Sequence, residues 1–150
     1  MSGVRRREFI ILLGSGSAAA AWPLVARAQP SGKTYRIGFL GPGSYAERKR
    51  DIDALRMGLR RLGYEEGRNT VIEYRWAEGR YDRLPELTAE LVKLNVDVLV
   101  TAGTPGALAA KQATSTIPIV LAAVGDPVAA GIVDSLARPG GNVTGLTLLC

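Results

Sequence analysis

The chain has 150 residues, of which 47% are hydrophobic, with 19 Lys or Arg, 14 Asp or Glu, no histidine and a single cysteine, Cys150. This composition lacks the ligands of the common zinc sites, the cysteine pair of an internal disulfide, and the histidine of Ser-His-Asp or Cys-His catalysis. We therefore expect no metal, no other cofactor and no enzyme of these kinds.

The first 28 residues have the layout of an export signal: a basic segment, an uncharged run over 11–26 and a small-x-small cleavage site. The residues that mark this signal are Arg6, Arg7, Phe9, Ala26 and Ala28. The uncharged run is shorter than the ~20 residues of a membrane-spanning helix. Paired arginines before a weakly hydrophobic core favour the twin-arginine export machinery, with an ordinary secretory signal or a retained membrane anchor as alternatives. We expect cleavage after Ala28 and a mature chain over 29–150, soluble in the periplasm.

Most of the formal charge of +5 belongs to this predicted signal, which holds four arginines and one glutamate. The mature chain is then close to neutral, with one basic cluster on a predicted helix over 47–62. Such a cluster is usually the solvated face of a helix. The charge pattern therefore predicts no nucleic-acid partner.

Strands and helices alternate along the remaining sequence. Apolar runs predict strands over 35–41, 70–76, 96–102, 117–124 and 142–149. Apolar residues at helical spacing, preceded by capping residues or proline, predict helices over 47–62, 82–94, 104–113 and 126–137. The strand over 70–76 alternates apolar with polar residues, so we expect it at or near a sheet edge. Ser44 and Glu47 have the spacing of a capping box at the start of the first helix.

This alternation, with short connections and nearly continuous apolar strands, is typical of a parallel sheet covered on both faces. Since crossovers between parallel strands are right-handed, few topologies remain. We predict an α/β fold with a doubly wound, parallel five-stranded sheet in the flavodoxin-like order 2-1-3-4-5.

Ligands of a doubly wound sheet bind at the carboxyl ends of the strands, where the strand order reverses. At this edge, the loops after the first, third and fourth strands supply the candidate ligand-binding residues Ser44, Tyr45, Thr104, Pro105, Gly106, Asp126 and Pro127. The two predicted helix starts in these loops would offer N–H groups and a positive dipole end to a carboxylate. With a hydroxyl from Thr104, an acceptor for an amine at Asp126 and a ring at Tyr45, the edge suits a small zwitterion with an apolar or aromatic side chain.

A simpler interpretation of the same residues stays open. Thr104 and Asp126 also fit the role of N-caps for their helices, and Tyr45 fits a purely structural role. No Gly-Lys-Ser/Thr phosphate loop follows any predicted strand.

Three stretches of sequence stand out: GRNTVIEYRWAEG at 67–79, AGTP with AAKQAT within 102–114, and VGDP with LARPGGNVTG within 124–145. In these stretches, and over essentially all of 29–149, the chain resembles a family of bacterial ABC-transporter substrate-binding proteins, some of them linked to aromatic amino acids. The resemblance implies a type I periplasmic-binding-protein fold, capture of a small-molecule ligand, and its delivery to an ABC permease in the inner membrane. It also implies that the loops at 44–45, 104–106 and 126–127 face the ligand.

Members of the resembled family continue for about as long again and build a second lobe, with the ligand cleft between the lobes. We therefore expect the chain to be the N-terminal lobe, ending inside the fifth strand. Three alternatives to a transport protein stay open: a periplasmic ligand-sensing domain of a signalling system, a non-functional truncated fragment, and a small flavodoxin-like enzyme. The lack of histidine and of a phosphate loop counts against the enzyme.

Overall fold

The computed structural model describes residues 32–148. The predicted export signal, with Arg6, Arg7, Phe9, Ala26 and Ala28, lies outside the described residues. From Thr34 onward, the described chain forms one compact unit. Within residues 32–148, no helix combines the length and the apolar character needed to cross a membrane.

A parallel five-stranded sheet forms the centre of this unit. Its order, β2-β1-β3-β4-β5, confirms the predicted order 2-1-3-4-5 and the position of the second strand at an edge. The strands are β1 (Tyr35–Gly41), β2 (Thr70–Trp76), β3 (Val98–Ala102), β4 (Ile119–Val124) and β5 (Val143–Thr147). The first two have the predicted bounds, because an apolar run forms the first, an alternating run forms the second, and glycine or polar turn residues flank them.

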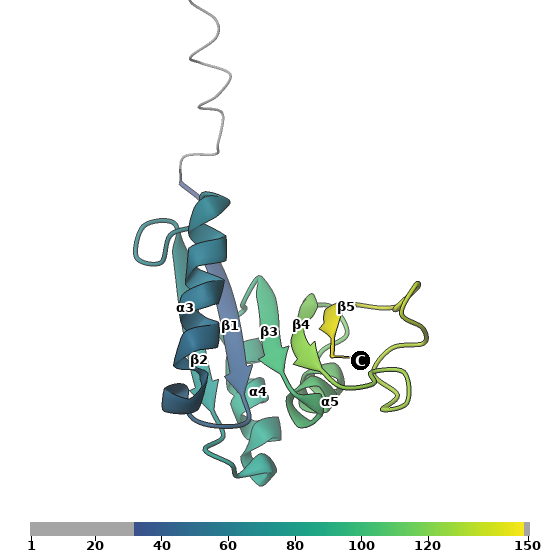
Figure 1. Ribbon diagram of the computed structural model, residues 1–150. Coiled ribbons are helices and arrows are strands. Elements are labelled where there is room, and N and C mark those ends of the chain that lie inside the picture. The colour runs from purple at the N-terminus through teal and green to yellow at the C-terminus, as the bar shows by residue number, and fades with distance from the viewer. Residues whose placement is uncertain (1–31, 149–150) are drawn as a thin grey trace, which may run out of the picture. The chain divides into compact units, whose positions relative to one another are not determined.

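Helices cover both faces of the sheet (Figure 1). One face carries α3 (Tyr45–Arg61), which lies over β1 and β2, whereas α4 (Leu84–Lys93) and α5 (Thr104–Ala113) lie on the opposite face. A short 3-10 turn, η1 (Tyr81–Arg83), leads into α4. The two faces follow from right-handed crossovers, because the chain steps from β1 to β2 in one direction and from β2 past β1 to β3 in the other.

Alternate residues of the central strands fill two apolar cores. On the α3 side, Phe39 of β1 shares a core with Ile52. On the other side, Leu40 of β1 shares a core with Leu91 of α4 and Leu99 of β3. The residues Leu40, Ile52, Leu91 and Leu99 are all 0% exposed. Burial of each such side chain contributes about 1.5–3 kcal/mol, which explains why the strands are apolar on both faces.

Two strands begin two residues later than predicted: β3 at Val98 rather than 96, and β4 at Ile119 rather than 117. A turn holds the backbone before β4. The N–H of Ile117 donates to the Thr114 hydroxyl at 3.1 Å, and the side-chain amide of Asn142 donates to the Ile117 carbonyl at 2.7 Å. These bonds occupy the backbone groups that an earlier start of the strand would need.

The predicted helix over 126–137 is wrong, because the structure has a single turn there, followed by an irregular loop. Gly131 has a φ of 68°, and its N–H donates to the carbonyl of Val128 at 2.9 Å. The N–H of Ile132 donates to the carbonyl of Pro127 at 2.8 Å. Together these features form the Schellman arrangement that ends a helix. Gly131 therefore stops the helix after one turn, and Ile132 enters the core.

Candidate ligand-binding site

The loops after β1, β3 and β4 converge at the carboxyl edge of the sheet, the end to which the strand arrows point in Figure 1. A Cβ added at Gly103 would lie 3.5 Å from the ring of Pro42. One added at Gly125 would lie 4.0 Å from the hydroxyl of Thr104. The first loop thus contacts the second, and the second contacts the third. The residues that the sequence predicts for the site thus lie on neighbouring loops along one edge of the sheet.

Ser44 is the N-cap of α3, and the capping box expected from the sequence is present. Its hydroxyl oxygen accepts from the N–H of Glu47 at 3.3 Å, and its own N–H donates to the Glu47 carboxylate at 2.9 Å. An N-cap of this kind contributes about 1 kcal/mol to stability. One lone pair of the Ser44 oxygen is therefore engaged within the helix, and its hydroxyl hydrogen and second lone pair are left for a ligand.

Tyr45 is the first residue of α3 and is 39% exposed. Its ring meets the ring of Trp76 edge-on, with centroids 6.0 Å apart and planes at 77°. One side of the ring is thus fixed by protein, while part of the residue stays exposed to solvent. An exposed ring held in this way provides an apolar surface for a ligand.

The interpretation of Thr104 as an N-cap is wrong, because Gly103 occupies that position with a φ of 78° and no side chain caps the helix. Glycine is suited to this backbone conformation, which lets the chain turn sharply out of β3. Thr104 is the first helical residue and Pro105 the second. The Thr104 hydroxyl is therefore not engaged as a cap, and the first-turn N–H groups of α5 have no carbonyl within the helix to bind.

Gly106 is buried, and it contributes close packing rather than an exposed surface. A Cβ at this position would overlap the hydroxyl of Thr101, which donates a 3.1 Å hydrogen bond to the carbonyl of Leu40. The glycine thus allows α5 to approach β3 and β1 closely. Its only available contribution to a ligand is its backbone N–H.

Asp126 caps a single turn rather than the helix that the simpler interpretation of the sequence expects. Its Oδ1 accepts from the N–H of Val128 at 3.0 Å and from the N–H of Ala129 at 2.9 Å. The residue is nevertheless exposed, and Pro127 beside it is buried. The cap bonds use one carboxylate oxygen, so the second oxygen is available to an ammonium group.

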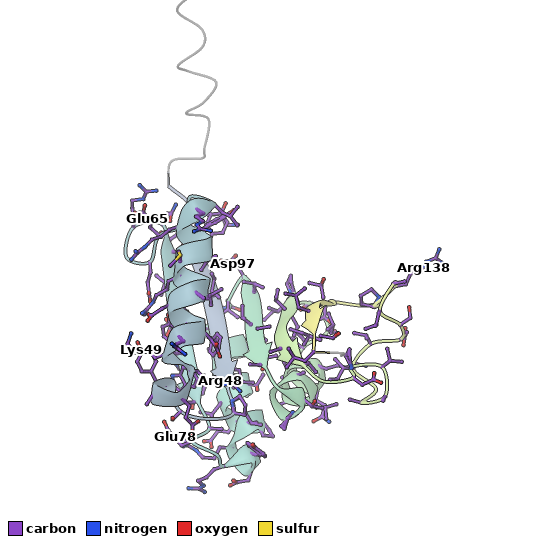
Figure 2. All side chains as sticks on the ribbon, viewed as in Figure 1. Arg48, Lys49, Glu65, Glu78, Asp97 and Arg138 are labelled. Carbon is purple, nitrogen blue, oxygen red and sulfur yellow. The ribbon has the colours of Figure 1, made fainter. Side chains whose placement is uncertain are left out.

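The loop after β2 also belongs to this edge, although the sequence analysis did not include it. The N–H of Ala77 donates to the carbonyl of Gly41, the last residue of β1, at 2.9 Å. The N–H groups of Glu78 and Gly79 donate to carbonyls of the loop after β1, at 3.1 and 2.9 Å. Figure 2 shows Glu78 at the same end of the sheet. Glu78 is exposed and has a φ of 54°, which is uncommon for a residue with a side chain. Trp76 is the last residue of β2, and Glu78 follows it in the loop.

Two basic side chains near the start of α3, Arg48 and Lys49, are labelled in Figure 2, and each is paired with an aspartate of the same helix. Lys49 Nζ lies 2.6 Å from Asp53 Oδ2, and Arg48 Nη1 lies 3.1 Å from Asp51 Oδ2. The hydrogen bond between Lys49 and Asp53 raises the pKa of the lysine and lowers the pKa of the aspartate. These charges balance one another on the surface of α3, as expected for a solvated helix face. Among the described residues, no group of three His, Cys, Asp or Glu side chains is placed to hold a metal ion.

Comparison with known proteins places this edge in context. The profile of a family described as ABC transporter substrate binding protein matches residues 41–148. The "Tyrosine-binding protein" of Clostridioides difficile is 41% identical over 83 residues, which are 55% of this chain and 24% of that protein.

Solved structures agree with this match. A conserved domain protein from Vibrio cholerae superposes with a TM-score of 0.74 at 40% identity, over 78% of this chain and 40% of that one. An ABC domain from Streptococcus pneumonia in complex with L-Trp superposes with a TM-score of 0.71 at 30% identity, over 77% of this chain and 39% of that one. The chain thus spans less than half the length of each of these relatives.

Proposed function

Since the chain belongs to the family of ABC transporter substrate-binding proteins, we propose that it captures an amino acid with an aromatic or apolar side chain for uptake. The observation that carries this proposal is that the α5 start, the Asp126 carboxylate and the exposed Tyr45 ring all follow the carboxyl ends of parallel strands, at one edge of the sheet. These groups match the carboxylate, the ammonium and the side chain of a free amino acid. The five-stranded unit corresponds to one lobe of a periplasmic binding protein.

The start of α5 is the proposed carboxylate subsite. Its first-turn N–H groups carry partial positive charge, and the helix dipole adds to their attraction for an anion. The hydroxyl of Thr104 lies at this start and makes no capping bond, so it can donate to the same carboxylate. Pro105 has no N–H, which leaves Thr104 and Gly106 as the backbone donors of the turn.

The second oxygen of Asp126 is the proposed ammonium acceptor. The α5 start and Asp126 lie on adjacent loops, since Gly125 approaches the hydroxyl of Thr104. An anion subsite beside a carboxylate fits the two opposite charges of a zwitterion. The hydroxyl hydrogen of Ser44 adds a donor at the start of α3. Pro127 is buried and supports the turn that carries Asp126, since its carbonyl accepts from the N–H of Ile132.

The ring of Tyr45 is the proposed contact for the ligand's side chain. A ring–ring contact contributes about 0.5–1.5 kcal/mol beyond the area that it buries. The relatives support a ligand of this class, since one is a tyrosine-binding protein and one is solved with L-Trp. The opposing wall of the site is proposed to come from a second lobe, as in a periplasmic binding protein whose cleft closes around its ligand.

Calorimetric titration of the exported protein with the set of common amino acids tests the proposal. We expect tryptophan, tyrosine and phenylalanine to bind more tightly than the other amino acids. If no amino acid binds, the proposed ligand class is wrong.

The same proposal includes export by the twin-arginine machinery to the periplasm and delivery of the ligand to an inner-membrane permease. Replacing Arg6 and Arg7 by lysine should stop export, because that machinery recognises paired guanidinium groups. Normal levels of a mature form that begins at Gln29 in the periplasmic fraction would contradict the twin-arginine route.

A further inference from the structure

We propose that Trp76 is a positioning residue that fixes the ring of Tyr45 in the ligand site and thereby favours ligands with a flat side chain. The proposal rests on the proposed function of the carboxyl edge. Trp76, the last residue of the edge strand β2, would thus contribute to the selectivity of the site among amino-acid ligands.

Trp76 is placed beside the site by the pairing of β2 with β1. As the last residue of β2, it lies in register with Gly41, three positions before the Ser44 cap of α3. Its ring is 6.0 Å from the Tyr45 ring at 77°, which is the edge-to-face arrangement that aromatic pairs prefer. Trp76 is half-buried, so it holds Tyr45 from the protein side of the edge.

Gly41 allows the tryptophan ring to lie against the backbone of β1. A Cβ at this position would overlap the six-membered part of the Trp76 ring. Any larger residue at the end of β1 would therefore push the ring out of its place. The absence of a side chain at Gly41 thus leaves the space that the Trp76 ring occupies.

Neighbouring rings hold Trp76 on its other sides. Tyr74 lies parallel to it, with planes at 5° and centroids 6.4 Å apart, and Phe39 lies 5.3 Å from it. The guanidinium of Arg56 sits over the Tyr74 ring at 5.5 Å, and its Nε lies 2.7 Å from the Glu66 carboxylate. A continuous column of packed groups thus runs from α3 to the edge and ends at Tyr45. This column leaves Trp76 little freedom to move, which is what a positioning residue requires.

The consequence for binding is specific to the shape of the ligand. With Trp76 in place, the 39% exposed ring of Tyr45 keeps one orientation and presents a defined surface. With a smaller residue at position 76, the Tyr45 ring gains conformational freedom. Ordering the ring on binding then costs free energy, so the affinity falls for ligands that contact the face of the ring. Ligands with small aliphatic side chains use less of that face and should lose less affinity.

The experiment measures dissociation constants of the exported protein for L-tryptophan and L-leucine by calorimetry. The variants are Trp76→Leu, Trp76→Phe, Tyr45→Leu and the double variant Trp76→Leu/Tyr45→Leu. The matched control is Tyr64→Leu, since Tyr64 packs edge-on against Tyr35 at 5.3 Å and 83° in another aromatic pair, outside the column. Trp76→Phe keeps an aromatic ring and serves if the leucine variant does not fold.

We expect Trp76→Leu to lower the affinity for L-tryptophan by about 3- to 10-fold, which corresponds to the loss of one aromatic pair, and the affinity for L-leucine by less. Trp76→Phe should weaken L-tryptophan by a smaller factor. The double variant should bind no more weakly than Tyr45→Leu alone, because Trp76 acts through Tyr45, and Tyr64→Leu should leave both affinities unchanged. Additive losses in the double variant, or equal losses for the two ligands, would overturn the proposal. Failure of the wild-type protein to bind either ligand would instead contradict the proposed function.

Discussion

The carboxylate of Asp126 accepts a hydrogen bond from the backbone N–H of Ala129 at 2.9 Å, while Asp126 itself stays exposed at the edge of the sheet. One oxygen is thus engaged in capping a turn, and the other is available to a ligand. Because asparagine caps about as well as aspartate but carries no charge, substitution can separate the two roles.

The capping role predicts a difference in stability between two variants of Asp126. Asp126→Ala should lower the free energy of unfolding by about 0.5–2 kcal/mol, whereas Asp126→Asn should change it by only a few tenths. Urea unfolding of both variants beside the wild-type protein measures this. Equal stability of the alanine variant and the wild type would show that the two cap bonds contribute nothing.

The absence of a capping bond at Thr104 predicts that its hydroxyl is dispensable for folding. Thr104→Val, which keeps the shape of the side chain, should change stability by less than about 0.5 kcal/mol. It should weaken amino-acid binding by about 2- to 10-fold through the loss of one hydrogen bond. The matched control is Ser44→Ala, which removes a true cap and should destabilise by about 1 kcal/mol. A large destabilisation by Thr104→Val would restore the capping role that the sequence suggested.

Two glycines with open space for a methyl group should respond in opposite directions to alanine. Gly131 has a φ of 68° and nothing within 4 Å of an added Cβ, so Gly131→Ala should destabilise by about 1 kcal/mol through backbone strain alone. Gly58 lies in α3 with equally open space, and Gly58→Ala should stabilise by about 0.5–1 kcal/mol. Thermal unfolding of the two variants compares them. A Gly131→Ala protein as stable as the wild type would mean that the turn after β4 does not depend on this backbone conformation.

The buried hydroxyl of Tyr74 predicts a loss of stability at alkaline pH. It has no hydrogen-bond partner among residues 32–148, and burial, together with the negative charge of Glu66, raises its pKa above the ordinary value. The positive charge of Arg56 opposes this effect only in part. Because the folded state favours the neutral phenol, stability should be unaffected by this group below about pH 10 and should fall above it, where the unfolded tyrosine ionises first.

Tyr74→Phe should therefore reduce the alkaline loss and leave stability at neutral pH unchanged or raised by about 1 kcal/mol. Tyr81→Phe is the control, since Tyr81 is 56% exposed. Urea unfolding at pH 7 and above pH 10 measures both effects. An alkaline loss of the same size in Tyr74→Phe and the wild type would assign the effect to other groups.

The strands of the sheet were predictable because each is a continuous run of residues in the sequence, and their order was predictable because crossovers are right-handed. The strands over 35–41 and 70–76 are continuous apolar or alternating runs, and the right-handed crossover rule fixes their arrangement. The helix over 126–137 was predicted wrongly because its apolar residues have helical spacing, although the run contains a glycine that ends the helix. Gly131 lies within that run, and a single positive φ there outweighs the helical pattern.

The structural roles of the candidate residues were harder to predict than their place at the carboxyl edge of the sheet. The rule for doubly wound sheets gave the carboxyl edge and the loops after β1, β3 and β4. It did not distinguish Gly103 from Thr104 as the cap, because that depends on a backbone angle. It also missed Trp76, whose contact with Tyr45 depends on the pairing of β2 with β1 and on the space left by Gly41.

The most direct test of amino-acid capture at this edge compares L-tryptophan with indole-3-propionate, which lacks only the ammonium group, in wild-type and Asp126→Asn proteins. Asparagine keeps the cap, so the fold is preserved while the charge is removed. We predict that Asp126→Asn lowers the affinity for L-tryptophan by about 10-fold or more, as expected for the loss of a hydrogen bond to a charged group. The affinity for indole-3-propionate should change by less than about twofold. Equal affinity of the two proteins for L-tryptophan would contradict the account.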